Sequence, residues 1–163
     1  MKKLLLLVGL VVFLVTSFAY SWDGPDEYKI YLKEKKKCLL DHMLEIDNDR
    51  ASKEIDKACD VVGEIATGAR DHNAKYWDEE IFFANCVFKN IHKASDKNNR
   101  AAALIGKACR LLGVLSVGGY KNNVEGPQYY RDIASCVLEN ISKSKSDGSA
   151  KSIGNICKMD EVW

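Results

Sequence analysis

The segment from Cys86 to Cys109, CVFKNIHKASDKNNRAAALIGKAC, is repeated fifty residues later as CVLENISKSKSDGSAKSIGNIC, from Cys136 to Cys157. Five of the first eight positions are identical in the two segments. A more divergent copy, CLLDHMLEIDNDRASKEIDKAC, runs from Cys38 to Cys59, and every copy has an isoleucine four residues before its second cysteine. A period of this size is typical of a repeated supersecondary unit. The sequence therefore predicts three copies of one unit.

Each unit is predicted to be a pair of helices. In the second unit, apolar residues recur at helical spacing from Ile81 to Ile91. The polar segment SDKNNR interrupts this pattern, and AAALIGKACRLLGVLSV resumes it. No segment alternates apolar and polar residues as a strand would. The predicted fold is all-α, with three tandem disulfide-linked helical hairpins packed as a compact six-helix bundle, and an open superhelical stack is the alternative.

The second unit is expected to lie at the centre of the bundle. Its second helix is apolar almost all round, with only Lys107 and Arg110 interrupting the sequence AAALIGKACRLLGVL. Such a helix has to be covered on several sides. Gly63 and Gly113, each four residues after a cysteine, would permit close approach of neighbouring helices.

All six cysteines follow the N-terminal apolar segment, and an even number of cysteines in an oxidising compartment predicts three disulfides. In each unit the two cysteines are nearly equidistant from the predicted turn, which favours Cys38–Cys59, Cys86–Cys109 and Cys136–Cys157. Pairing Cys59 with Cys86 and Cys109 with Cys136 is also symmetric about its turns, so the spacing leaves this alternative open. It would require a third, dissimilar bridge between Cys38 and Cys157.

The N-terminus has the layout of a secretory signal peptide. Lys2 and Lys3 precede an apolar run from Leu4 to Val15, and small residues follow at Ala19 and Ser21. Residues 1–21 are therefore predicted to be removed. Residues 22–163 would form a single secreted, extracellular domain, with repeats at about 24–70, 74–119 and 125–160. No later segment is apolar enough to span a membrane.

Charge and motif content argue against several classes of function. The formal net charge is +1, whereas a generic binder of nucleic acid or of anionic membranes needs surplus positive charge. The long cysteine intervals do not fit a zinc site, and neither a catalytic motif nor a cofactor motif is present. We therefore expect no catalytic residues, no metal, no cofactor and no enzymatic activity. A weaker enzymatic hypothesis would require His42 or His92 to face a cleft beside a carboxylate.

Two features are candidate sites. Aromatic residues occupy the first turns of the first helices in all three units and could form a ligand-binding or contact surface: Tyr28, Tyr31, Tyr76, Trp77, Tyr129 and Tyr130. The sequence Asn140-Ile141-Ser142 is an N-glycosylation sequon, which makes Asn140 a candidate glycosylation site.

These observations predict a secreted, disulfide-stabilised, non-enzymatic binding or effector protein that acts on an extracellular protein partner, of the kind found in venom, saliva or other gland secretions. The alternative is an extracellular carrier of a small apolar ligand. Its cavity would be lined by apolar residues of the second unit, such as Phe82, Phe83, Phe88, Leu104 and Leu111.

Overall fold

Helices joined by short turns make up the part of the chain that the structure, a computed structural model, describes: residues 25–43, 46–68, 74–94 and 98–162. The predicted signal peptide, residues 1–21, lies outside these ranges. The helices are α2 (Pro25–Met43), α3 (Asp49–Ala66), α4 (Ala74–Asn90), α5 (Asn99–Ser116), α6 (Gly126–Asn140) and α7 (Asp147–Ile156). Short 3-10 turns, η2 (Ile91–Lys93), η3 (Ile141–Lys143) and η4 (Met159–Glu161), follow α4, α6 and α7. The all-α fold class is confirmed.

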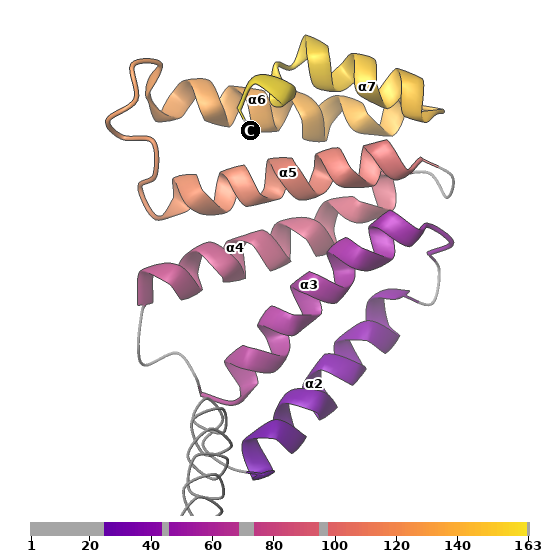
Figure 1. The fold of residues 1–163 in the computed structure, drawn as a ribbon, viewed down its shortest axis with the longest axis vertical. Coiled ribbons are helices and arrows are strands. Elements are labelled where there is room, and N and C mark those ends of the chain that lie inside the picture. Colours follow the sequence, from indigo (N-terminus) through magenta and orange to yellow (C-terminus); the bar gives the residue numbers. More distant parts are fainter. Residues whose placement is uncertain (1–24, 44–45, 69–73, 95–97, 163) are drawn as a thin grey trace, which may run out of the picture.

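The hairpins follow one another across the bundle in chain order, with α5 in the middle (Figure 1). Helix α5 packs against α3, α4, α6 and α7. Its sequence explains this position, because its buried residues point in several directions: Ala101, Ala102, Leu104, Ile105, Gly106, Ala108, Cys109, Leu111, Gly113 and Leu115. The central place predicted for the second unit is confirmed.

One disulfide joins the two helices of each hairpin. The bridges are Cys38–Cys59, Cys86–Cys109 and Cys136–Cys157, with Cα–Cα distances of 5.6, 5.4 and 5.6 Å. These distances lie within the usual range for disulfides. The pairing favoured by the spacing is confirmed, and the alternative pairing across units is wrong.

The recurring Asn-Ile pair ends the first helix in the second and third units. Asn90 Nδ2 donates to the carbonyl oxygen of Cys86 at 2.9 Å, and Asn140 Nδ2 donates to that of Cys136 at 2.8 Å. The isoleucine that follows each asparagine is buried and begins a 3-10 turn. The repeated sequence therefore encodes a repeated helix end.

A polar side chain eleven residues before the second cysteine caps the second helix of every unit. Asn48 Oδ1 accepts from Arg50 N and Ala51 N, and Asn98 Oδ1 accepts from Ala101 N at 2.9 Å. Ser146 Oγ performs the same role for α7 by accepting from Ser149 N. Such caps satisfy amide groups that have no partner within the helix.

The beginnings of α3, α5 and α7 are also linked from one unit to the next. Arg50 N donates to Asn99 Oδ1 at 3.3 Å, and Arg100 N donates to Asp147 Oδ1 at 2.9 Å. In both contacts, the second residue of a helix donates to the first residue of the corresponding helix in the next unit. We refer to these two contacts as the capping ladder.

Two of the glycines allow neighbouring helices to approach closely, as the sequence predicts. A Cβ atom at Gly63 would lie 2.6 Å from Cδ2 of Tyr31 on α2. A Cβ atom at Gly113 would lie 2.8 Å from the carbonyl oxygen of Glu79 on α4. Because real Cβ contacts are longer than this, any larger residue would push these helices apart.

Candidate functional site

An open groove of about 270 Å³ lies between α3 and α5, above a buried ring of α4. Its lining residues are Arg50, Glu54 and Lys57 from α3, Phe83 from α4, and Ala103, Gly106, Lys107 and Arg110 from α5. The cationic side chains of the groove are partly exposed to solvent. Arg50 and Lys57 are 44% and 54% exposed, and Lys107 and Arg110 are 39% and 31% exposed.

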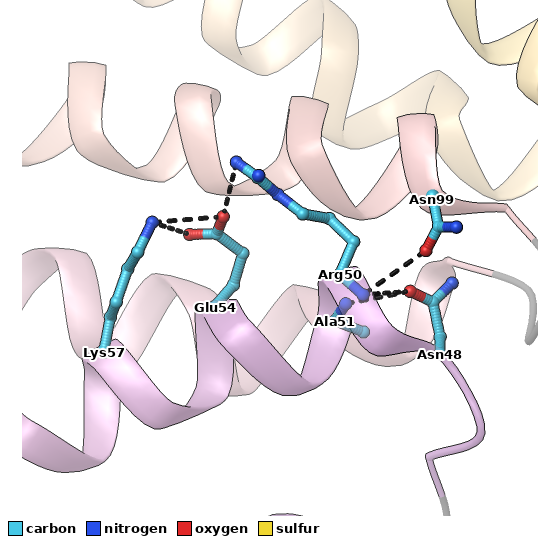
Figure 2. A network of polar contacts seen from close by, with 6 residues as sticks. All are labelled: Asn48, Arg50, Ala51, Glu54, Lys57 and Asn99. Atoms are coloured by element: carbon cyan, nitrogen blue, oxygen red, sulfur yellow. Dashed lines mark hydrogen bonds and ion pairs between the residues drawn. The ribbon is translucent and has the colours of Figure 1, made fainter.

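Glu54 is the buried polar centre of the groove, with only 4% of its side chain exposed. Arg50 lies one helical turn before it and approaches Oε1 at 3.0 Å. Lys57 lies on the other side, with Nζ 3.4 Å from both carboxylate oxygens. Figure 2 shows the two cations reaching Glu54 from opposite sides. Since a buried carboxylate without a partner would be costly, these two side chains stabilise Glu54 in its position.

Gly106 makes room for this carboxylate. A Cβ atom at position 106 would lie 2.7 Å from both Cδ and Oε2 of Glu54. The absence of a side chain on α5 therefore lets Glu54 lie directly against the helix backbone. The charged groove depends on a close approach between α3 and α5.

Arg110 forms the other end of the groove, where α5 faces α4. Its guanidinium pairs with the carboxylate of Glu80. It also lies 3.9 Å from the centroid of the Phe83 ring, a cation–π contact. Phe83 itself is 2% exposed, so it forms a fixed apolar floor beneath the guanidinium.

A third carboxylate connects the groove to the last unit. Asp160 of η4 accepts from Arg100 Nη2 at 2.9 Å and lies 3.7 Å from Lys107 Nζ. Around the groove, five cations therefore share three carboxylates: Arg50 and Lys57 with Glu54, Arg100 and Lys107 with Asp160, and Arg110 with Glu80. These ion pairs contain two more cations than carboxylates.

The predicted aromatic residues lie at the starts of α2, α4 and α6, along one side of the bundle (Figure 1). They form ring pairs unit by unit: Tyr28 with Tyr31 at 6.3 Å, Tyr76 with Trp77 at 5.5 Å, and Tyr129 with Tyr130 at 5.3 Å between centroids. Tyr28 and Tyr76 are half exposed, whereas Trp77 is buried. None of these residues lines the α3–α5 groove.

Tyr31 belongs to a polar cluster that holds α2 against α3. Its hydroxyl donates to Asp60, and Lys35 pairs with both Asp56 and Asp60. Burial, together with donation to Asp60, raises the pKa of Tyr31 to about 12. Burial alone would lower the pKa of Lys35, but its bonds to Asp60 and Asp56 outweigh this effect and raise that pKa. Lys35, the central residue of the basic sequence KEKKK (33–37), thus has a structural role.

The residues proposed to line an apolar ligand cavity differ in their burial. Phe83, Leu104 and Leu111 are buried in the core, Phe88 is partly buried, and Phe82 is 42% exposed. Neither His42 nor His92, the residues of the enzymatic hypothesis, is among the residues that line the groove. His42 is exposed and stacks on Phe88 at 4.2 Å, and His92 is exposed in η2.

The amide of Asn140 is engaged in the fold. Its Nδ2, the atom to which a glycan would be attached, donates to Cys136, while its Oδ1 accepts from Lys143 Nζ at 2.7 Å. Asn90 makes the same bond to Cys86 in a unit that has no sequon. Asn140 thus has a structural role, and its glycosylation stays a prediction.

The groove residues Arg50, Glu54 and Lys57 were not predicted from the sequence. On a helix, their spacing is typical of exposed ion pairs. A stronger signal was available on α5, where Lys107 and Arg110 are the charged residues of an otherwise apolar segment. Charged residues within an otherwise apolar helix indicate that part of its surface is exposed to solvent in a gap between the neighbouring helices.

Comparisons with protein-family models, with curated proteins and with solved structures found no match. Among the described residues, no helix combines the length and the apolar character needed to cross a bilayer.

Proposed function

We propose that the protein is an extracellular, non-enzymatic binding protein that recognises a partner protein through the α3–α5 groove. The observation that carries this proposal is the arrangement of four cationic side chains, each 31% to 54% exposed, around an apolar floor. They are Arg50, Lys57, Lys107 and Arg110. Positive side chains gathered in this way can be matched by negative charge on a partner, and such complementarity gives specificity.

The disulfides support an extracellular location. Bridges such as Cys38–Cys59 form and persist in oxidising environments and are rare in reducing ones. The signal peptide expected at residues 1–21 agrees with this compartment. Two bridges, Cys38–Cys59 and Cys86–Cys109, also hold α3 and α5 to the other helices of their hairpins, which reduces the ordering cost of binding.

The chemistry of the groove favours a protein over a small apolar ligand. Apolar ligands are usually enclosed in cavities that bury most of their surface. Here Leu104 and Leu111 lie in the core, and the groove is bordered by charged groups that would lose hydration against an apolar molecule. A segment of a partner protein can supply both apolar and polar groups.

The proposal can be tested by partner capture with the full-length, oxidised chain. The groove variant is Lys57→Gln with Lys107→Gln, in which Glu54 keeps Arg50 and Asp160 keeps Arg100 as partners. The matched control is Lys36→Gln with Lys37→Gln, which removes the same charge from exposed positions on α2. A partner should be retained by the wild type and the control, and its purified form should bind the groove variant less tightly.

Equal binding of the purified partner to all three proteins would contradict recognition through the groove. Enrichment of an apolar small molecule with no protein would favour the carrier function instead.

A further inference from the structure

The distribution of charge in the groove points to the chemistry of its partner, on the assumption that the proposed function is correct. Two of the three carboxylates lie deep, with the side chains of Glu54 and Glu80 only 4% and 11% exposed, whereas Asp160 beside Lys107 is 34% exposed. The cations extend outward from them. Around Glu54 and Glu80, a molecule approaching from solvent therefore meets positive charge first, and complementary negative charge would increase its rate of association.

Two lysines have donor capacity left over. Lys57 Nζ lies 3.4 Å from the Glu54 oxygens, and Lys107 Nζ lies 3.7 Å from Asp160. Both distances exceed the usual length of a charge-assisted hydrogen bond, about 2.7–2.9 Å. An ammonium group has three donors, so each lysine can form a shorter bond to a ligand. They extend from the two walls, Lys57 from α3 and Lys107 from α5.

The length of the groove fits a short piece of extended chain. Arg50 and Lys57 are seven residues apart on α3, which corresponds to about 10 Å along the helix. The same interval separates Ala103 from Arg110 on α5. An extended peptide advances about 3.3 Å per residue, so about three residues would span the groove.

We infer that the segment of the partner that enters the groove is acidic, and that its carboxylates bind Lys57 and Lys107. Arg50 and Arg110 already bind protein carboxylates. Their role is to keep the ends of the groove positive, and the two lysines provide the direct contacts.

Fluorescein-labelled hexaglutamate is a suitable probe, with hexaglutamine and hexalysine as comparisons of charge. Fluorescence anisotropy with the full-length, oxidised protein should detect binding of hexaglutamate alone. The affinity should fall by about threefold or more as ionic strength rises from about 0.01 M to about 0.15 M, because the Debye length shortens from about 30 Å to about 8 Å.

The groove variant and the α2 control then locate the contact. Lys57→Gln with Lys107→Gln should weaken hexaglutamate binding by about tenfold, as expected for the loss of two charge-assisted contacts. Lys36→Gln with Lys37→Gln should leave it unchanged. If the groove variant fails to fold, amide chemical-shift changes at Ala103 and Gly106 of the wild type provide the second measurement.

Three results would overturn the inference. They are equal binding by the groove variant and the α2 control, absence of shift changes at the groove amides, and displacement by sodium sulfate equal to that by unlabelled hexaglutamate at matched ionic strength. Hexaglutamate should also compete with a captured partner. Failure to compete with a groove-dependent partner would reject the acidic segment while leaving the proposed function intact. A partner that binds independently of the groove would reject the proposed function itself.

Discussion

The carboxylate of Glu54 occupies the space that a side chain at Gly106 would need, since a Cβ atom there would lie 2.7 Å from Oε2. Gly106→Ala should therefore displace Glu54 and destabilise the protein by about 1–2 kcal/mol, despite the better helix propensity of alanine. In the Glu54→Ala background the clash is absent, so the same substitution should be neutral or stabilising by up to about 1 kcal/mol.

Urea denaturation of the four proteins of this double-mutant cycle measures the coupling. Gly148→Ala is the control, because the nearest atom to its added Cβ is Ser146 Oγ at 3.8 Å. Equal effects of Gly106→Ala in both backgrounds would show that Glu54 does not depend on this glycine.

Asn98 links the second and third units and is fully buried. Besides capping α5, its Nδ2 donates to Ser144 Oγ at 2.7 Å and to the carbonyl oxygen of Ser146 at 3.2 Å. Asn98→Ala removes the cap and leaves buried groups without partners, so we expect a loss of about 2–3 kcal/mol. The exposed Asn155→Ala should change stability by less than about 0.5 kcal/mol. Similar thermal midpoints for the two variants would contradict this role.

Helix α2 should be separable from the rest of the bundle. It packs chiefly on α3, where the Cys38–Cys59 bridge joins them. Replacing both cysteines with serine should cost about 3 kcal/mol in the loop-entropy account of disulfides. Hydrogen exchange should then accelerate in residues 25–43 while the amides of α5 stay protected. A uniform loss of protection along the chain would indicate one cooperative unit instead.

Because Tyr31 ionises in strongly alkaline solution, the free energy of unfolding should decrease there. Its pKa is raised from 10.0 to about 12 in the folded protein, so the folded state retains its proton more strongly than the unfolded state does. The corresponding stability is fully present below about pH 10 and is lost as pH rises toward 12. Lys35, whose pKa is also raised, acts in the same direction.

Tyr31→Phe preserves the ring that packs on Gly63 but removes the ionisable hydroxyl. Its urea midpoint should therefore decline less steeply than that of the wild type between about pH 10 and 12. The measurement requires intact disulfides, verified by mass spectrometry. Parallel curves for the two proteins would contradict the role of Tyr31.

The sequence predicts the hairpins and their bridges because these features depend on local spacing. Cysteines equidistant from a turn come to the same height on two antiparallel helices, and an apolar helix such as α5 must be covered by others. Both inferences use residues of one unit at a time. For this reason both inferences also hold for the first unit, although its sequence differs from those of the other two.

The groove depends on how different units meet, which spacing along the chain does not specify. Glu54 and Gly106 are 52 residues apart and touch across a unit boundary. The aromatic residues show what the repeat does specify. Tyr28 and Tyr76 each lie ten residues before the first cysteine of their unit, and both are 49% exposed. Trp77, the neighbour of Tyr76, has no aromatic counterpart at its position in the other units and is buried.

Both hydrogen bonds of the capping ladder run in the same direction along the chain. An amide of the earlier unit always donates, and the first helical residue of the later unit accepts. The first unit also has such an acceptor, Asp49, at the start of α3. A circular permutant that placed the first hairpin after the third would bring Asp49 toward the second amide of α7, at Gly148. The same connector would then be available to a new pair of neighbours, although the apolar faces of α5 would still have to be covered on several sides.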